Sequence, residues 1–302
     1  MEIKALEDFT IDKNAIISLK KMGHNFEVCY CEHRNNKIAI QLIDKDNYIY
    51  LPSGEVRQCN HIESRADNKL QVSQSLKRLR EYINTNVIDT SACKWLTLTY
   101  KENMTDTCRL YKDFKRFVTR FKRKFGNIEY IVACEPQGRG AWHLHCIFIF
   151  NKKCPYIPNN IVASLWGQGF TKTQKLSNNI DNIGAYLTAY LGDMALEDAK
   201  NQNIDFNQKD IKEVTEIDNM TLSKPKKFVK GARLVLYPPN FNLYRVSRGI
   251  KKPTKELLPY GRAKEKVGSA LKPTYVKGLT LLDAKKNFSN KIIYEYYNTR
   301  RQ

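Results

Sequence analysis

The stretch NIEYIVACEPQGRGAWHLHCIFIF, residues 127–150, contains two apolar segments on either side of a short polar one. β-branched and aromatic residues are frequent in both apolar segments, and the intervening PQGRGA holds the glycines that a tight turn favours. This pattern predicts a β-hairpin. Its second segment ends in CIFIF, which is apolar on both faces of a strand, so we expect it at the centre of a sheet covered on both sides.

Glu135, His143 and His145 lie where this hairpin turns. Side chains alternate along a strand, so His143 and His145 share a face while Leu144 points away. A turn centred near Arg139 sets Glu135 opposite His143, and a centre one residue later sets it opposite His145. Either register brings one carboxylate and two imidazoles together. They suit a catalytic metal site with open coordination positions, or histidines that merely bond to backbone at the rim of the sheet.

The segments around the hairpin predict an α+β fold with an antiparallel sheet. KWLTLTY (94–100) is typical of a strand, and amphipathic helices are expected over 67–86, behind an Asn-type N-cap, and over 110–125, ended by Gly126. The phenylalanines of the second helix recur every three or four positions, as core residues do. A further helix is expected at NIGAYLTAYLGDMA, and short apolar runs in the first sixty residues predict a small antiparallel meander.

Charge is distributed unevenly along the 302 residues. The chain has 51 Lys plus Arg against 31 Asp plus Glu, a net charge of +20. Residues 224–302 carry 20 basic and 4 acidic side chains, a net +16, whereas residues 192–218 carry 3 and 8, a net −5. A basic excess concentrated in one quarter of the chain indicates a polyanionic partner, in particular a nucleic acid.

Several function classes find no support in the sequence. No run reaches the roughly 18 apolar residues that span a bilayer, and MEIKALEDFTIDK is not a signal peptide, so we expect a cytoplasmic protein without a membrane partner. No GxxxxGK[ST] motif for ATP is present. The 8 cysteines form no CxxC pair and are expected to be thiols, although a zinc site from Cys29, Cys31, Cys59 and His61 stays open.

Tyr186 and Tyr190 lie four positions apart in IGAYLTAYLGD. On a helix this spacing puts both phenols on one face, so both hydroxyls can reach one phosphate in turn. A phenol with a pKa near 10 needs activation at neutral pH, and a nearby divalent cation supplies it. Two aromatic residues that pack a helix on a sheet are the alternative interpretation.

Taken together, these motifs resemble the HUH endonucleases, most closely the rolling-circle replication initiator (Rep) proteins of bacterial plasmids and single-stranded DNA phages. WLTLTY resembles the first family motif, WHLHCIF with the upstream Glu135 resembles the metal-binding second, and AYLTAYL resembles the tyrosine-bearing third. The motifs occur in the family's order. The resemblance extends over about residues 67–255.

The resemblance implies a ferredoxin-like or RRM-like antiparallel sheet flanked by helices, with metal and tyrosine on one face. It implies that Glu135, His143 and His145 bind Mg²⁺ or Mn²⁺ and that a tyrosine attacks origin DNA. The products would be a 5′-phosphotyrosine and a 3′-OH primer, with later strand transfer and religation. Tyr190 is the preferred first nucleophile over Tyr186. Family members often carry a lysine three residues after the tyrosine, and Asp193 occupies that place here as a candidate auxiliary residue.

Partners follow from the same resemblance and from charge. We expect binding to single-stranded DNA at a replication origin in a bacterial host cell, with the host helicase and DNA polymerase recruited there. The oligomeric state stays open. Phosphate contacts are expected from the following basic residues: Arg139 in the hairpin turn, and Arg245, Arg248, Lys251 and Lys252 in the densest basic cluster.

Four segments are expected along the chain. They are a β-rich N-terminal extension (1–66), the HUH nuclease core (67–192), an acidic connecting segment (193–223) and a basic C-terminal region (224–302) that binds DNA and contributes part of the nuclease domain. Two alternatives to the initiator stay open. One is a conjugative relaxase or HUH transposase, and the other is a non-catalytic module that binds single-stranded nucleic acid.

Overall fold

The structure, a computed structural model, describes residues 2–7, 9–34, 37–61, 64–176, 184, 191–214, 217–218, 221–222, 226–282 and 288–301. It has two compact units, which we describe one at a time. The central unit is residues 64–252, and the terminal unit is residues 1–63 with 253–302. Among the described residues, no helix is long and apolar enough to cross a membrane.

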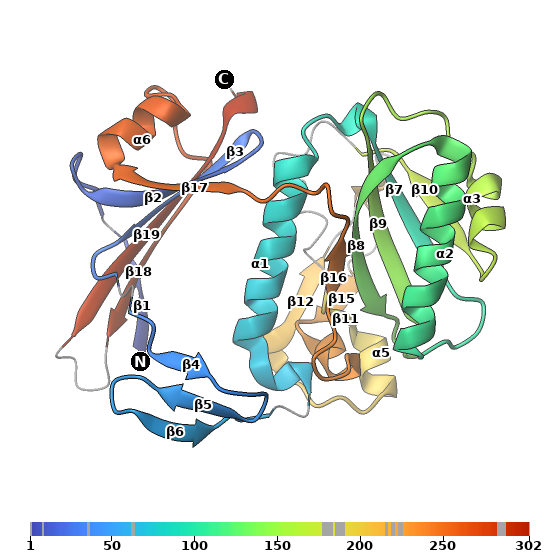
Figure 1. Cartoon of the computed structure of the whole chain (residues 1–302), viewed down its shortest axis with the longest axis horizontal. Helices are drawn as coiled ribbons and strands as arrows, with labels where there is room; N and C mark the ends of the chain where they lie inside the picture. The colour runs from blue at the N-terminus through green and yellow to red at the C-terminus, as the bar shows by residue number, and fades with distance from the viewer. Residues whose placement is uncertain are drawn as a thin grey trace. The chain divides into compact units, whose positions relative to one another are not determined.

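The central unit is built on a sheet with the strand order β10-β7-β9-β8-β16, in which every neighbouring pair is antiparallel (Figure 1). This confirms the α+β fold and the central place of the histidine strand. The strands are β7 (Cys93–Thr99), β8 (Ile128–Pro136), β9 (Trp142–Phe150), β10 (Thr171–Gln174) and β16 (Tyr244–Val246).

Three helices cover this sheet: α1 (Lys69–Asn86), α2 (Thr107–Phe125) and α3 (Asn159–Trp166). Helix α1 begins at Asn68, whose side chain accepts the Gln71 N–H at 2.9 Å. The C-cap of α2 is Gly126 with φ 88°, a value that favours glycine, as the sequence predicts.

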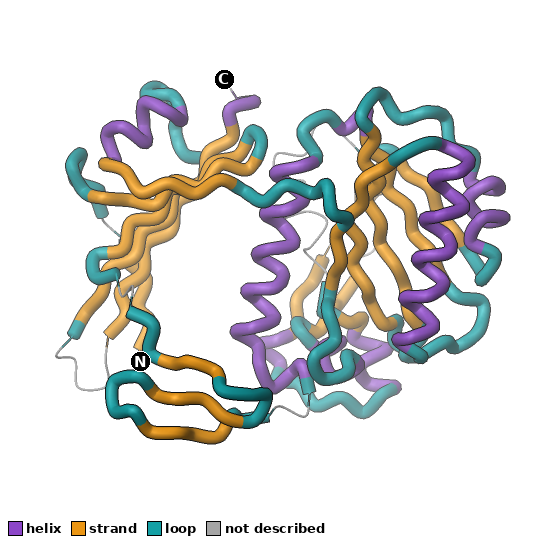
Figure 2. Tube along the Cα trace, in the orientation of Figure 1, coloured by secondary structure: helices purple, strands orange, loops and turns teal. Residues whose placement is uncertain are grey.

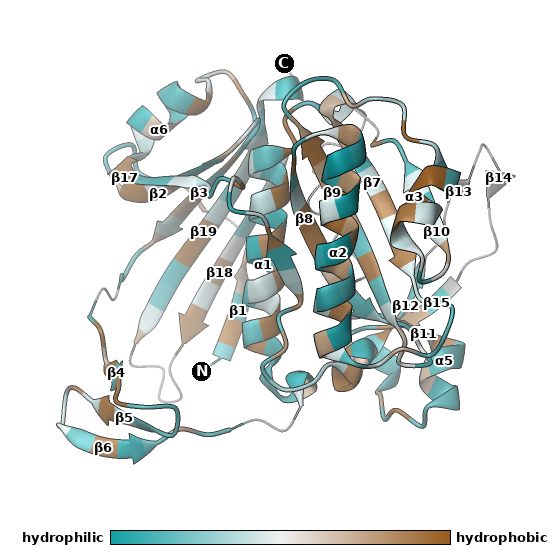
Figure 3. Cartoon of the chain, turned by 45° about the vertical axis from the view of Figure 1, so that its right-hand side comes forward, coloured by the Kyte–Doolittle hydropathy of each residue, from teal (hydrophilic) through white to brown (hydrophobic). Residues whose placement is uncertain are grey.

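The two faces of the sheet have separate cores. On the α1 face, Leu79 and Ile83 pack with Ile131 and Ile147. On the other face, α2 presents its phenylalanines to Leu144 and Phe148 of β9, which confirms that they are core residues: Phe114, Phe117 and Phe121. Figure 3 shows the hydrophilic residues of α2 along its outer side. The polar residues of the hairpin therefore stand out against a well-packed sheet.

Smaller elements complete the central unit. β15 pairs with both β11 and β12, and β13 pairs with β14. The elements are β11 (Met194–Ala195), β12 (Ile211–Val214), β13 (Ile217–Asp218), β14 (Thr221–Leu222), β15 (Lys226–Val229), α5 (Leu196–Asn201) and the 3₁₀ turns Arg65–Asn68, Thr90–Ala92, Gln208–Asp210 and Ala232–Leu236.

The terminal unit has a larger antiparallel sheet, ordered β1-β18-β19-β3-β2-β17 and drawn as a continuous set of strands in Figure 2. A separate sheet, β4-β5-β6, follows β3 in the chain. The elements are β1 (Glu2–Leu6), β2 (Ile16–Met22), β3 (Asn25–Cys31), β4 (Ile40–Leu42), β5 (Asn47–Tyr50), β6 (Glu55–Gln58), β17 (Thr254–Pro259), α6 (Tyr260–Val267), β18 (Tyr275–Leu282), β19 (Ser289–Asn298) and the 3₁₀ turn Thr299–Arg301.

These units differ from the four segments expected along the chain. The basic C-terminal region is divided, because residues 224–252 belong to the central unit while β17 and β19 pair with β2 and β3 of the terminal unit. The N-terminal strands therefore share one sheet with strands from the other end of the chain.

Candidate active site

The hairpin of β8 and β9 has the register in which Glu135 is directly opposite His143. It is the register with the turn centred near Arg139: the Gln137 N–H donates to the Ala141 carbonyl at 2.7 Å. His145 lies one pair further on, opposite Ala133. The expected grouping of Glu135, His143 and His145 on one face is therefore present in the structure.

Glu135 is the centre of the polar contacts. Its Oε2 lies 2.7 Å from Nε2 of His145, and its Oε1 lies 2.5 Å from Nη1 of Arg233. The side chains of Glu135 and Arg233 are 11% and 14% exposed, so this ion pair is largely shielded from water. A buried carboxylate needs such compensation, which Arg233 and His145 provide here.

His143 is held by neutral groups. Its Nε2 lies 3.1 Å from Oγ1 of Thr99, and its Nδ1 lies 3.3 Å from Nε2 of Gln137. Thr99 belongs to β7, where it is directly opposite His143. The two imidazoles are stacked with ring centroids 4.8 Å apart, and Trp95 approaches His145 edge-on at 6.2 Å.

Burial and neighbouring charges set the protonation of this group. Burial, with the nearby charges of His145 and Arg233, lowers the pKa of His143 to about 4 against the opposing effect of Glu135. Burial alone would raise the pKa of Glu135, but the hydrogen bond with His145 and the charge of Arg233 outweigh it and lower that pKa. Near neutral pH, Glu135 is therefore a carboxylate and His143 a neutral imidazole.

The donor types fit a divalent cation, although the side chains are arranged for direct contact with one another. A neutral imidazole and an ionised carboxylate are the forms that bind metals, and Nδ1 of His145 is buried without a partner among the described residues. Both oxygens of Glu135 are engaged by side chains. Within the described ranges, no cluster of three or more His, Cys, Asp or Glu is spaced to hold an ion. Metal binding therefore requires Glu135 and His145 to separate.

Arg233 is a site residue that the sequence did not indicate. It is about a hundred positions from Glu135 in the chain, and no local pattern singles it out. Besides its ion pair, its Nη1 donates to the Pro136 carbonyl at 2.9 Å and its Nε donates to the Asp193 carbonyl at 2.8 Å. Arg233 thus joins the end of β8 to the residues that follow the tyrosine segment.

Asp193 is close to this network but has its own partners. Its carboxylate is paired with Lys212 and accepts the Gly231 N–H at 2.9 Å. Only its backbone carbonyl is linked to Glu135, through Arg233. In this arrangement the Asp193 side chain positions the chain after the tyrosines, and a role at a metal stays a prediction.

Tyr186 and Tyr190 lie outside the described residues, but the residues on both sides of them are placed. The Gly184 N–H donates to Oδ1 of Asn84 on α1 at 2.8 Å. A Cβ at Gly184 would come within 2.5 Å of the Arg80 carbonyl, so a glycine allows this close approach. Leu191 lines a small cavity together with His145, Trp95 and Ala133. Both flanking residues therefore lie on the side of the sheet that carries the histidines.

The predicted phosphate-binding residues are dispersed over the central unit. Arg139 is exposed in the hairpin turn and donates to the Tyr100 carbonyl at 3.3 Å. The guanidinium of Arg245 lies over the ring of Tyr111, 3.3 Å from its centroid. Arg248, Lys251 and Lys252 are exposed in the segment that follows β16. None of the five contacts Glu135 or the two histidines through an interaction in the described part of the chain.

The four zinc candidates of the terminal unit have other partners. The Cys31 thiol lies 3.6 Å from Oδ1 of Asn290, and Nε2 of His61 lies 3.0 Å from Oδ1 of Asp46. All 8 cysteines are free thiols. Cys29, Cys31, Cys59 and His61 form no metal-ligating cluster in this structure, whose description includes all four.

Comparison with protein families identifies one relevant similarity. The family model described as replication-associated protein ORF2 matches residues 93–195, about a third of the chain. This is a family of rolling-circle replication initiators. The matched segment runs from the start of β7 to the end of β11 and includes Glu135, His143, His145 and both tyrosines. No curated protein and no solved structure matches in the corresponding searches.

Proposed function

We propose that this protein initiates rolling-circle DNA replication by nicking single-stranded DNA at an origin through a tyrosine nucleophile. The grouping of Glu135, His143 and His145 on one face of a central hairpin carries the proposal. Two further observations support it: residues 93–195 match a family of replication initiators, and the residues flanking Tyr186 and Tyr190 lie on the histidine face. The net charge of +20 suits a DNA partner.

In the proposed reaction, the oxygen of Tyr190 or Tyr186 forms a bond to the scissile phosphorus while the bond from phosphorus to the 3′-oxygen breaks. The phenol loses its proton, and the leaving 3′-oxygen gains one and becomes the primer end. The 5′ end stays bound to the tyrosine, so the energy of the phosphodiester is retained for strand transfer. Religation therefore needs no ATP.

The chain's own residues prepare this step. Glu135, His143 and His145 would hold Mg²⁺ or Mn²⁺, which supplies positive charge that polarises the scissile phosphate. Thr99 and Gln137 orient the His143 ring, and Arg233 keeps Glu135 ionised at the end of β8. A neutral His143 presents a lone pair at physiological pH.

The test is incubation of the full chain with labelled single-stranded oligonucleotides that tile the cognate origin, with Mn²⁺ or with chelator, followed by denaturing gels. We expect a protein-linked DNA fragment that requires the metal. His143→Ala or His145→Ala should abolish it, as should the double change Tyr186→Phe and Tyr190→Phe.

Matched controls use residues of the same type outside the site. His61→Ala and Tyr275→Phe change surface residues of the terminal unit and should leave the fragment unchanged. Cleavage that survives the double tyrosine change would exclude these nucleophiles. DNA binding without any adduct would instead indicate a non-catalytic single-strand binding module, and an adduct only with a transfer origin or a transposon end would indicate a relaxase or a transposase.

A further inference from the structure

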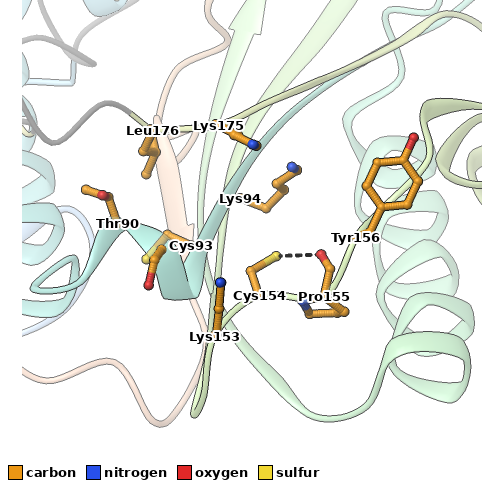
Figure 4. A pocket seen from close by; sticks show the side chains of 10 residues that line it. Thr90, Cys93, Lys94, Lys153, Cys154, Pro155, Tyr156, Lys175 and Leu176 are labelled. Atoms are coloured by element: carbon orange, nitrogen blue, oxygen red, sulfur yellow. Dashed lines mark hydrogen bonds between the residues drawn. The ribbon is translucent and has the colours of Figure 1, made fainter.

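A second polar feature of the central unit is a cavity of about 380 Å³ at the start of β7. We call it the lysine pocket, because three of its lining side chains are Lys94, Lys153 and Lys175. Figure 4 shows these three side chains around the hollow, together with Tyr156. We propose that the lysine pocket binds phosphate groups of single-stranded DNA and that Tyr156 stacks on a base of the same strand.

Strand pairing explains why two of these lysines meet. In the β10–β7 ladder, Gln174 is opposite Trp95, so the next positions along the two chains are Lys175 and Lys94. Residues directly opposed in an antiparallel pair share a face, and like charges in that arrangement repel. Two adjacent ammonium groups are therefore costly to the fold unless an anion lies between them.

The pocket offers no protein anion to relieve this repulsion. No Asp or Glu is among its described lining residues, and none of the three ammonium groups has an ion pair within the part of the chain that the structure describes. Lys94 is only 9% exposed, although a lysine this buried usually has a partner. A phosphate group supplies the missing negative charge and several hydrogen-bond acceptors.

Tyr156 indicates which phosphate compound fits. It is 85% exposed at the rim of the pocket, an unusual position for a large aromatic ring. Exposed aromatic rings beside basic side chains are how proteins bind single strands without sequence preference, because every base has a face for stacking. A nucleic acid strand meets both requirements at once, whereas inorganic phosphate uses only the lysines.

The pocket is separate from the candidate active site. Lys94 lies five positions before Thr99, which contacts His143, so about 17 Å of β7 separates them. Lys94 also shares a face with Leu96 and Leu98, on the side of the sheet opposite the histidines. At about 3.4 Å per stacked nucleotide, a strand that reaches both places contains at least about five nucleotides between them.

This inference rests on the proposed DNA substrate but not on nicking, so binding is the readout. The full chain is titrated into a fluorescein-labelled single strand of about 20 nucleotides, long enough for one binding site, and anisotropy is recorded at several salt concentrations. For the triple variant Lys94→Gln, Lys153→Gln and Lys175→Gln we expect about tenfold weaker binding. The slope of log K against log salt should fall by about 2, as the loss of three phosphate contacts predicts.

The matched control removes the same charge elsewhere in the same unit. Lys112, Lys115 and Lys124 are exposed on α2, and their change to Gln should reduce affinity far less than the pocket variant does. Equal losses for the two triple variants would overturn the proposal, because net charge alone would then explain the binding. Lys153→Gln with Lys175→Gln changes only exposed residues and guards against misfolding from Lys94.

Two more comparisons complete the test. Tyr156→Ala should weaken binding about fivefold or more through lost stacking, while Tyr156→Phe should bind as the parent does. Displacement of the strand by deoxyadenosine monophosphate at equal nucleotide concentration would overturn the assignment to a strand. If the parent forms no covalent adduct but the pocket variant still loses affinity, the nicking proposal fails and this inference stands. An adduct with normal binding by the pocket variant gives the opposite result.

Discussion

Each unit of this protein contains a buried glutamate on a sheet, and the two are neutralised in different ways. In the terminal unit, Glu295 accepts the hydroxyls of Tyr260 at 3.0 Å and Tyr297 at 2.5 Å, and Lys264 donates to Tyr297 at 3.2 Å. In the central unit, Glu135 contacts His145 and Arg233. Both carboxylates are buried, with 9% and 8% of their surface exposed.

The difference lies in what is left over. Around Glu135, Nδ1 of His145 and Oε1 of Gln137 are buried without hydrogen-bond partners among the described residues, whereas the described part of the terminal unit has no such atom. Buried polar groups in a purely structural cluster are normally satisfied, and unsatisfied ones often mark sites that bind something. The comparison teaches that the Glu295 cluster is closed, and that the Glu135 cluster has capacity to spare.

The largest expected effect separates the two glutamates by activity. Glu135→Gln should lower formation of the protein-linked DNA fragment about 1000-fold, since a bound metal contributes several kcal/mol to the transition state. Glu295→Gln should leave the fragment unchanged. Rates are measured with Mn²⁺ in excess on denaturing gels, and similar losses in both variants would refute the distinction between the clusters.

A smaller effect is expected on stability when Arg233 is removed. Arg233→Ala leaves Glu135 buried without its cation, which should cost the central unit about 3 kcal/mol. Lys227→Ala breaks an exposed ion pair with Glu213 and should cost less than about 1 kcal/mol. All 3 tryptophans lie in the central unit, so denaturant unfolding followed by tryptophan fluorescence reports on that unit.

Glu295→Gln tests the closed cluster in the same way. The amide is a weaker acceptor for the hydroxyls of Tyr260 and Tyr297, so the terminal unit should lose about 1.5 kcal/mol. Circular dichroism records both units, while the tryptophan transition should not move. A shift of the tryptophan transition would mean that the two units do not unfold separately.

The smallest expected effect is a pH dependence confined to the terminal unit. Burial, with the charges of Arg300 and Lys21, lowers the pKa of His24 below its usual value. The unfolded chain therefore binds this proton more readily, so the contribution of neutral His24 is present above about pH 6.5 and is lost as the pH falls. His24→Gln should remove this part of the decrease in Tm between pH 7 and pH 5, and an unchanged profile would contradict the assignment.

Local patterns were sufficient for the hairpin and its helices. Alternation along β9 put His143 and His145 on one face, and the glycines of the turn limited Glu135 to two registers. Asn68 and Gly126 marked the ends of helices because their side-chain chemistry and backbone freedom act over a few residues. The catalytic assignment of Tyr186 and Tyr190, which lie outside the described residues, stays a prediction.

Contacts between distant parts of the chain were not accessible in this way. Nothing near Arg233 indicates that it meets Glu135, and the pairing of β19 with β3 joins residues more than two hundred positions apart. Lys94 and Lys175 look like ordinary surface lysines until strand pairing sets them side by side. Strand periodicity and capping are short-range effects that can be read from neighbouring residues, whereas partners across a sheet depend on how the whole chain packs.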